Sequence, residues 1–226
     1  MLHFLTGEEL KNKPDLRDSM FMDRKKQFVD RLGWSLTCTN EQFEVDQYDR
    51  DDSCYVICSD SHNRHLGSMR LLPTNLPNMI QEHFSYVIPG ISFSSDRIWE
   101  CTRLCTTSGA SPRVAYSILA GAAKFMRSFE INAFLGLFDK RMHRAYRRLG
   151  ATPMVIGSST SDEGIVSIGL WQFERTTYEN LVKMSAYNNG EINNMFKDRS
   201  LSGATSIIDK RLPSRAPERE LDELVA

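Results

Sequence analysis

Apolar and polar residues are arranged along the first half of the chain in a pattern that predicts a helix followed by a hairpin. Apolar residues recur every three to four positions over 16–32, which is typical of an amphipathic helix, and Gly33 is expected to end it. Two short apolar runs, at 55–58 and 66–72, flank a polar turn at 60–63. These runs predict a β-hairpin.

The second half of the chain predicts strands that alternate with helices. A strand at 98–106 leads through a loop containing Ser and Gly into a long helix from Pro112 to about Phe129, for which Ser111 is a suitable N-cap. Further strands are expected at 43–48, 133–138, 152–156 and 164–173, and further helices at 76–84, 140–149 and 176–185. This order predicts an α/β (α+β) sandwich around one central sheet.

The composition changes near the end of the chain. Residues 187–226 contain many Asn and charged residues and few large apolar ones. We therefore expect one folded domain over 1–186 and a peripheral or partly disordered tail over 187–226, with one short helix at 217–225.

The overall composition excludes several classes of protein. Of the 226 residues, 41% are apolar and 25% charged, which excludes disorder throughout, and the net charge of −1 argues against a dedicated nucleic-acid or membrane-surface binder. No apolar run approaches the ~18 residues that span a bilayer, and the N-terminus lacks the basic start of a signal peptide. We expect a cytoplasmic protein with neither nucleic-acid nor membrane partners, as a monomer or weak dimer.

The five cysteines indicate neither a disulfide framework nor a metal site. Their number is odd, and the Cys54/Cys58 and Cys101/Cys105 spacings do not match paired zinc ligands. We expect them to be small apolar residues along strands and expect no metal.

Three charged residues lie inside apolar strands, where an unpaired charge is costly. They are Arg70, Glu100 and Arg103. Glu100 and Arg103 are three residues apart, so on a regular strand they would face opposite sides of the sheet. A bulge would bring them to one side and splay the sheet there. Separate surface ion pairs are the alternative.

Together with other charged and aromatic residues, these three resemble the acyl-homoserine lactone synthase (LuxI-type autoinducer synthase) family in order and spacing. The resemblance covers about residues 1–185. The matching residues are Arg24, Phe28, Trp34, Glu44, Asp46, Asp49, Arg70, Phe84, Glu100 and Arg103. It implies a fold like that of the GCN5-related N-acetyltransferases (GNAT): a three-layer sandwich whose central, mostly antiparallel sheet is splayed to form an acyl cleft.

The resemblance also implies a reaction that makes a quorum-sensing signal. An acyl thioester, on acyl carrier protein or coenzyme A, acylates the amine of S-adenosylmethionine. The carboxylate of that substrate then closes the lactone and releases methylthioadenosine. No cofactor is implied, because both reactants are substrates. The alternatives are another GNAT-type N-acyltransferase that uses acyl-CoA and a non-catalytic protein that senses a ligand.

Residue chemistry suits this reaction. Glu100 is our candidate for the base that deprotonates the amine, and Arg70 and Arg103 complete the catalytic group by holding its carboxylates in place. The residues expected to bind S-adenosylmethionine are Arg24, Phe28, Trp34, Asp46 and Asp49. Carboxylates attract its cationic groups, and aromatic rings stack on adenine or face the sulfonium. Phe28 fits equally well as a core residue that packs the first helix on the sheet.

A second group is expected to hold the acyl chain and its phosphopantetheine arm: Phe84, Ser108, Gly109, Arg113 and Gly136. The free N–H groups at the start of the long helix suit a phosphate. At the position of Gly136, members of the family that favour 3-oxo chains usually carry threonine. Glycine there favours an unsubstituted or 3-hydroxy chain and is expected to leave room in the cleft.

Five cations lie along one face of the helix predicted at 140–149. They are Lys140, Arg141, Arg144, Arg147 and Arg148. In a chain of net charge −1 this is a local concentration of positive charge, which we interpret as a docking surface for an acidic carrier protein. A solvated helix face and a nucleic-acid site are the alternatives.

Overall fold

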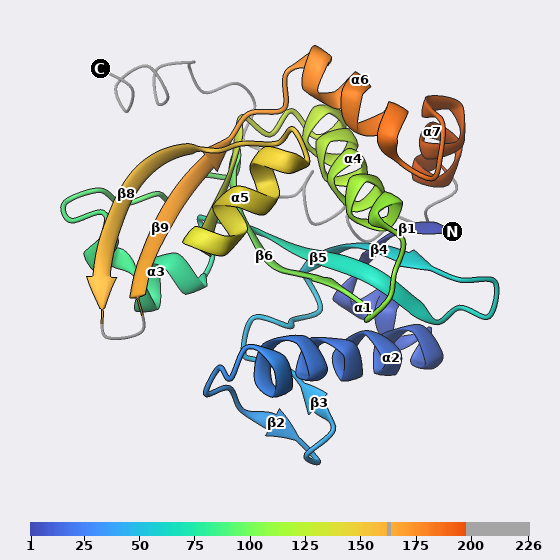
Figure 1. Cartoon of the computed structure of the whole chain (residues 1–226), viewed down its shortest axis with the longest axis horizontal. Helices are drawn as coiled ribbons and strands as arrows, with labels where there is room; N and C mark the ends of the chain where they lie inside the picture. The colour runs from blue at the N-terminus through green and yellow to red at the C-terminus, as the bar shows by residue number, and fades with distance from the viewer. Residues whose placement is uncertain (162–163, 198–226) are drawn as a thin grey trace.

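A computed structural model describes residues 1–161 and 164–197, and over this part of the chain seven strands form one mixed sheet in the order β1-β4-β5-β6-β7-β9-β8 (Figure 1). The strands are β1 (Leu2–Thr6), β4 (Cys54–Ser59), β5 (His65–Pro73), β6 (Ile98–Thr106), β7 (Ala133–Asp139), β8 (Met154–Ser161) and β9 (Gly164–Trp171). β2 (Cys38–Thr39) and β3 (Phe43–Glu44) form a separate two-stranded ribbon. None of the described helices is long and apolar enough to cross a membrane.

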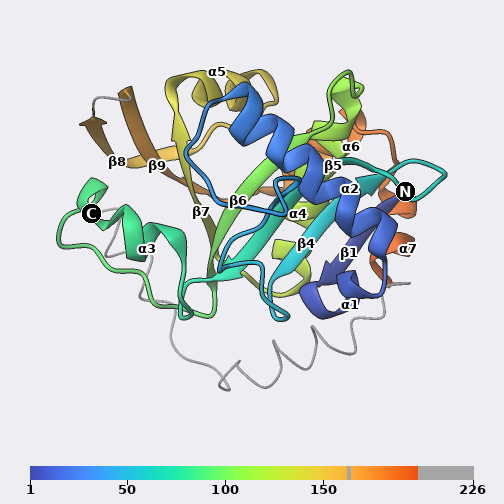
Figure 2. The same ribbon diagram turned by 90° about the horizontal axis from the view of Figure 1, so that it is seen from below.

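Helices cover both faces of the sheet, so the expected three-layer sandwich is confirmed (Figures 1 and 2). One face carries α4 (Pro112–Ser128), α5 (Lys140–Arg148), α6 (Arg175–Met184) and α7 (Asn189–Lys197). The other carries α1 (Gly7–Lys11), α2 (Pro14–Arg24), α3 (Met79–His83) and a 3-10 turn, η2 (Ser85–Val87). Apolar side chains fill the space on both sides because strand residues alternate between the faces.

The sheet is splayed at its centre, as expected. β6 and β7 are the parallel pair, and their pairing extends only from Ile98 to Glu100 on β6. The other pairings in the sheet are antiparallel. Beyond the Glu100–Leu135 pair the two strands diverge toward their C-terminal ends, which Figure 2 shows. We call this divergence the splay. The helices α4 and α5 begin at its wide end, because each follows one of the two parallel strands.

The N-terminal region differs in detail from the prediction. The helix expected over 16–32 is α2 followed by a π-helical segment, η1 (Lys25–Arg31), and Gly33, with φ +71°, follows it as expected. The buried strand β1 and the short helix α1 were not predicted. Thr6 and Glu9 form a capping box at the start of α1, and their spacing is the signal that would have identified that helix.

The expectation of a peripheral tail from residue 187 is wrong for its first part. α7 buries Ile192 and Phe196 against the α4 face of the sheet, and Phe196 meets Phe4 edge-on at a centroid distance of 4.9 Å. The rest of the tail, including the helix predicted at 217–225, lies outside the described residues.

Candidate active site

Six charged side chains converge on the face of the sheet that carries α2 and α3. We call them the charged cluster. Its members are Arg24 from α2, Glu44 from β3, Asp46 and Asp49 from the loop after β3, Arg70 from β5 and Arg103 from β6. The three arginines and Glu44 are buried, while Asp46 keeps 16% of its side-chain surface exposed. Asp46 is therefore the member most accessible to a molecule from solvent.

Arg24 joins the first helix to the loop after β3. Its Nε donates a hydrogen bond to Glu44 at 2.6 Å, and its two Nη atoms donate to the two oxygens of Asp49 at 2.8 and 2.9 Å. This is a bidentate ion pair, the most favourable geometry between a guanidinium and a carboxylate. The Tyr55 hydroxyl also donates to Asp49 at 2.8 Å.

Arg70 and Arg103 bind the remaining carboxylates. Arg70 donates to both oxygens of Asp46, at 2.6 and 3.1 Å, and lies 2.8 Å from Asp49. Arg103 donates from Nη2 to Glu44 at 2.9 Å and to Asp46 at 2.8 Å. Both arginines thus hold the carboxylates in place, as the sequence predicts for them.

Opposite charges in the cluster compensate one another, since three guanidinium groups face three carboxylates. Burial alone would lower the pKa of Arg24, but Asp49 and Glu44 outweigh it and raise that pKa. The pKa of Asp49 falls well below its ordinary value because Arg24 and Arg70 outweigh the effect of burial. These shifts favour the charged forms of Arg24 and Asp49, and the cluster is a buried ionic framework.

Glu100 adjoins this framework but makes a different set of contacts. Its carboxylate accepts hydrogen bonds from the backbone N–H groups of Met79, at 3.2 Å, and Ile80, at 2.7 Å, in the first turn of α3. The side chain is fully buried, and burial raises its pKa against the opposing effects of these bonds and of Arg70 and Arg103. A carboxylate with a raised pKa is a better proton acceptor than an ordinary one.

The bulge predicted in β6 is present. Ser68 pairs with Cys105 and Arg70 with Thr102, so Arg103 and Leu104 on β6 stand opposite a single residue of β5. Arg103 has a left-handed backbone, with φ +55°. The bulge turns the Arg103 side chain toward the cluster and to the same side as Glu100.

Phe28 and Trp34 form an aromatic stack beside the cluster. Their ring centroids are 5.0 Å apart with an interplanar angle of 17°, and the guanidinium of Arg103 lies 5.6 Å from the Phe28 centroid. Phe28 is buried, whereas Trp34 is 45% exposed. Phe28 therefore packs the first helix on the sheet and also lies beside the charged cluster.

The group expected to hold the acyl chain and its arm is not gathered in one place. Ser108 and Gly109 lie in the exposed turn between β6 and α4, and Arg113 donates to the Ser185 carbonyl at 3.2 Å. Phe84 follows α3 and packs with the apolar cluster under β7 and β9. Gly136 faces the opposite side of the sheet, toward α4 and α5.

The expectation that Gly136 leaves room in the cleft is wrong. A Cβ atom on this residue would lie 3.0 Å from Cys101 Sγ and 3.0 Å from Trp171 Cζ3. The space that a threonine would need is already filled by the indole ring.

The five cations of α5 are all exposed, as the helical spacing predicts. Asp139 caps the helix by accepting a hydrogen bond from the Met142 N–H at 2.8 Å. α5 begins directly after β7, one of the two strands that diverge at the splay. The positive face is thus close to the place where the two central strands separate.

Thr102 and Tyr55 were not identified from the sequence. Thr102 accepts a hydrogen bond from Arg70 Nε at 3.1 Å, and Tyr55 binds Asp49. Both lie on strands with side chains toward the cluster. Alternation from Glu100 was the available signal for Thr102, and pairing across the hairpin with Arg70 was the signal for Tyr55. The described residues include no group of His, Cys, Asp and Glu side chains that could hold a metal ion.

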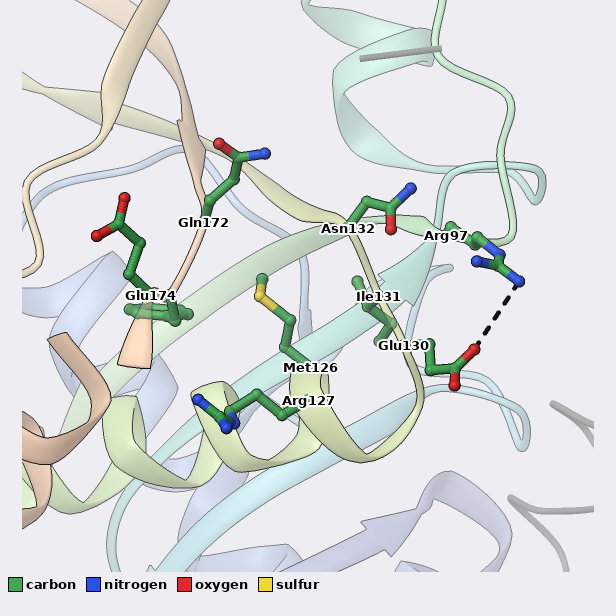
Figure 3. A pocket seen from close by; sticks show the side chains of 9 residues that line it. Arg97, Met126, Arg127, Glu130, Ile131, Asn132, Gln172 and Glu174 are labelled. Carbon is green, nitrogen blue, oxygen red and sulfur yellow. Dashed lines mark ion pairs between the residues drawn. The ribbon is translucent and has the colours of Figure 1, made fainter. Parts of the chain in front are cut away.

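A surface pocket of about 550 Å³ lies elsewhere, between the end of α4, the start of β7 and the end of β9 (Figure 3). Arg97 and Glu130 form an ion pair of 4.0 Å at its rim, and Met126 lies in its floor. No predicted site residue lines it. The charged cluster, and not this pocket, is therefore the candidate active site.

Comparison with known sequences finds matches over most of the chain. A family profile described as autoinducer synthase matches residues 8–180. An acyl-homoserine-lactone synthase of Rhizobium etli is 33% identical over 178 residues, which cover 76% of this chain and 84% of the relative. An enzyme of the same name from Pseudomonas fluorescens is 31% identical over 151 residues, 65% of this chain and 76% of the relative.

Comparison with solved structures identifies the fold. TofI, in a ternary complex with an inhibitor and MTA, matches with a TM-score of 0.68 at 27% identity, over 80% of this chain and 96% of that one. BjaI, a CoA-dependent acyl-homoserine lactone synthase with SAM and isopentyl-CoA, matches with 0.73 at 18% identity, over 87% and 99%. An acyl-CoA N-acyltransferase from Pseudomonas aeruginosa matches with 0.50 at 14% identity, over 76% and 99%. The last two show the fold alone, and the GNAT-like fold is thereby confirmed.

Proposed function

The chain belongs to the autoinducer synthase family and is an acyltransferase, and from this premise we propose how its charged cluster makes an acyl-homoserine lactone. The proposed substrates are S-adenosylmethionine and an acyl thioester. The proposed products are an N-acyl-homoserine lactone, methylthioadenosine and the free thiol of the carrier.

The observation that supports this proposal most directly is that Glu100 lies beside the charged cluster at the splay. Glu100 is the last residue of β6 that pairs with β7, so its carboxylate lies where the sheet opens. Its pKa is raised by burial, while Arg24 and Arg70 lower the pKa of Asp49 in the adjoining cluster. One site therefore combines a proton acceptor with a partly exposed carboxylate, that of Asp46, which suits a cationic amine substrate.

The reaction has two steps. Glu100 accepts a proton from the ammonium of S-adenosylmethionine, directly or through a water molecule, and the free amine attacks the thioester carbonyl. The carbon–sulfur bond breaks and the carrier leaves as a thiol. Its sulfur takes one of the two protons that the nitrogen loses, and the other passes through Glu100 to solvent. The substrate carboxylate then attacks the γ-carbon and displaces methylthioadenosine, which closes the lactone without further proton transfer.

Asp46 is suited to attract the positive charge of the substrate, because it is the exposed carboxylate of the charged cluster. The stack of Phe28 and Trp34 is suited to contact the adenine or the sulfonium. Arg24, Arg70 and Arg103 keep the carboxylates in position, since their guanidinium groups are already engaged with them.

The acyl donor in this proposal is carried by acyl carrier protein. The exposed cations of α5 give an acidic protein a surface to bind, and they lie near the splay through which its arm would reach the site. Gly136 has no hydroxyl group for a 3-oxo substituent, so an unsubstituted or 3-hydroxy chain is proposed. Coenzyme A is the second candidate donor, because the structural relative BjaI is described as CoA-dependent.

Turnover of the purified protein tests the proposal. S-adenosylmethionine is offered with acyl donors of several chain lengths, on carrier protein and on coenzyme A, and mass spectrometry follows both products. We expect lactone and methylthioadenosine in equal amounts. Acylation without lactone would identify a general N-acyltransferase. Binding of S-adenosylmethionine without any product would identify a ligand-sensing protein.

A further inference from the structure

Two glycines lie side by side on the α4 face of the sheet, and aromatic rings rest directly on them. Gly136 on β7 pairs with Gly169 on β9. A Cβ on Gly136 would lie 3.0 Å from Trp171 Cζ3, and a Cβ on Gly169 would lie 2.6 Å from Phe138 Cε1. A Cβ on Gly169 would force a shift, and one on Gly136 would be a tight contact, so both positions suit glycine beneath the rings.

A hydrogen bond and two aromatic contacts fix the Trp171 side chain in this position. Its indole N–H donates a hydrogen bond to the Ala151 carbonyl at 2.7 Å. Its ring meets Tyr146 of α5 edge-on at a centroid distance of 5.0 Å and Phe138 at 5.8 Å. Only 5% of the residue is exposed. The indole is thus a fixed part of the structure, and a rotation would break a buried hydrogen bond.

Trp171 also lies directly behind the splay. The Gly136 position that its ring covers is bounded on the other side by Cys101, the residue after Glu100 on β6. The charged cluster occupies one face of the sheet at this level, and the aromatic side chains occupy the other. The acylated S-adenosylmethionine, which has a charged head and an apolar chain, matches this division, because the chain is stabilised only on the apolar face.

We propose that the Trp171 indole sets the upper limit on the length of the acyl chain that this enzyme transfers. The proposal rests on the proposed function. A chain that passes between β6 and β7 beside Glu100 meets the ring after Cys101 and Gly136. Each additional methylene then requires the ring to move or the chain to bend, and in an apolar pocket one methylene changes specificity by about 10-fold or more.

Replacement of Trp171 tests the proposal. The kcat/KM of the wild type, Trp171→Phe and Trp171→Leu is measured with unsubstituted donors of increasing chain length on one carrier. We expect the length at which activity falls to increase from wild type to Phe to Leu. The ratio of kcat/KM for a donor just above the wild-type limit to that for the best wild-type donor rises by about 10-fold or more in Trp171→Leu. Gly136→Ala adds a carbon against the ring and is expected to shift the limit to shorter chains.

Phe4→Leu is the matched control, because Phe4 is an equally buried aromatic residue of the same apolar core on the far strand β1. It is expected to lower the melting temperature without changing the ratio. An unchanged ratio in the Trp171 and Gly136 variants, with an active wild type, overturns the inference alone. A wild type that makes no lactone from any donor overturns the proposed function, and the inference with it.

Discussion

Glu100 and Arg103 lie three residues apart on β6, yet both side chains contact Met79 on the same face of the sheet. The Glu100 carboxylate accepts a hydrogen bond from the Met79 N–H at 3.2 Å, and Arg103 Nη1 lies 3.9 Å from the Met79 sulfur. On a regular strand the two side chains would point to opposite faces. The left-handed backbone at Arg103 removes that alternation, at a cost of about 1–2 kcal/mol. Without it, Glu44 and Asp46 would lose a guanidinium partner.

Glu100→Gln is expected to reduce kcat by about 100-fold or more, because an amide does not accept the proton of the substrate amine. The measurement is lactone formation under saturating substrate, together with a melting curve. Glutamine also loses one acceptor for the N–H groups of α3, so a structural loss has to be separated from a chemical one. Asn78→Ala is the control, since it removes the side-chain cap of the Gln81 N–H in the same helix and leaves Glu100 intact. Wild-type activity in Glu100→Gln would exclude Glu100 as the base.

Asp49→Asn is expected to lower the free energy of unfolding by about 3–5 kcal/mol, because it leaves Arg24 and Arg70 buried with one carboxylate fewer. Urea denaturation measures this difference. Asp51→Asn provides the comparison: Asp51 pairs with Lys11 but is 61% exposed, and its loss is expected to cost no more than about 1 kcal/mol. Equal effects of the two substitutions would show that the charged cluster adds no more stability than a surface ion pair.

The charges of the site could be predicted from the sequence because they are exceptions to a pattern. Arg70, Glu100 and Arg103 interrupt apolar strands. Burying such charges is costly unless each has a charged or hydrogen-bonding partner, so partners can be expected nearby. The spacing of Glu100 and Arg103 even predicts the bulge. Contacts made by backbone groups produce no comparable pattern in the sequence. The N–H groups of α3 that bind Glu100 could come from any residue types, so no pattern identified them.

Packing between elements that are distant along the chain could not be predicted from the sequence either. Gly136 suggested free space, but the indole of Trp171 fills it, and no local pattern connects the two positions. β1 was missed because five residues with His3 among them are too few to show a period. α7 was missed because Asn and Gly at its start are typical of loops, although Ile192 and Phe196 are spaced for one buried face.

His3 makes the fold sensitive to acid. Burial, with smaller effects of Lys13 and the N-terminal amine, lowers its pKa from 6.5 to about 4. Below pH 6.5 His3 is therefore protonated in the unfolded chain, whereas in the folded chain it is protonated only near pH 4. The free energy of unfolding consequently falls over this range by no more than about 3 kcal/mol. His3→Gln is expected to flatten the free energy of unfolding between pH 6.5 and 4. His62→Gln, a substitution in an exposed turn, provides the comparison. An unaltered slope in His3→Gln would assign the acid sensitivity to other groups, such as His65, whose pKa burial also lowers.

Charge reversal on α5 tests whether the donor is a carrier protein. Arg144→Glu with Arg147→Glu places two negative charges on the exposed face of the helix and is expected to lower kcat/KM for an acyl-carrier-protein donor by about 10-fold at low salt. The deficit is expected to shrink as salt screens the repulsion, while kcat/KM for an acyl-CoA donor changes much less. Lys13→Glu with Lys183→Glu alters the net charge equally at exposed positions on α2's N-cap and α6, and is expected to leave both donors unaffected. Equal losses in the two double variants would reflect net charge and would reject α5 as the docking surface.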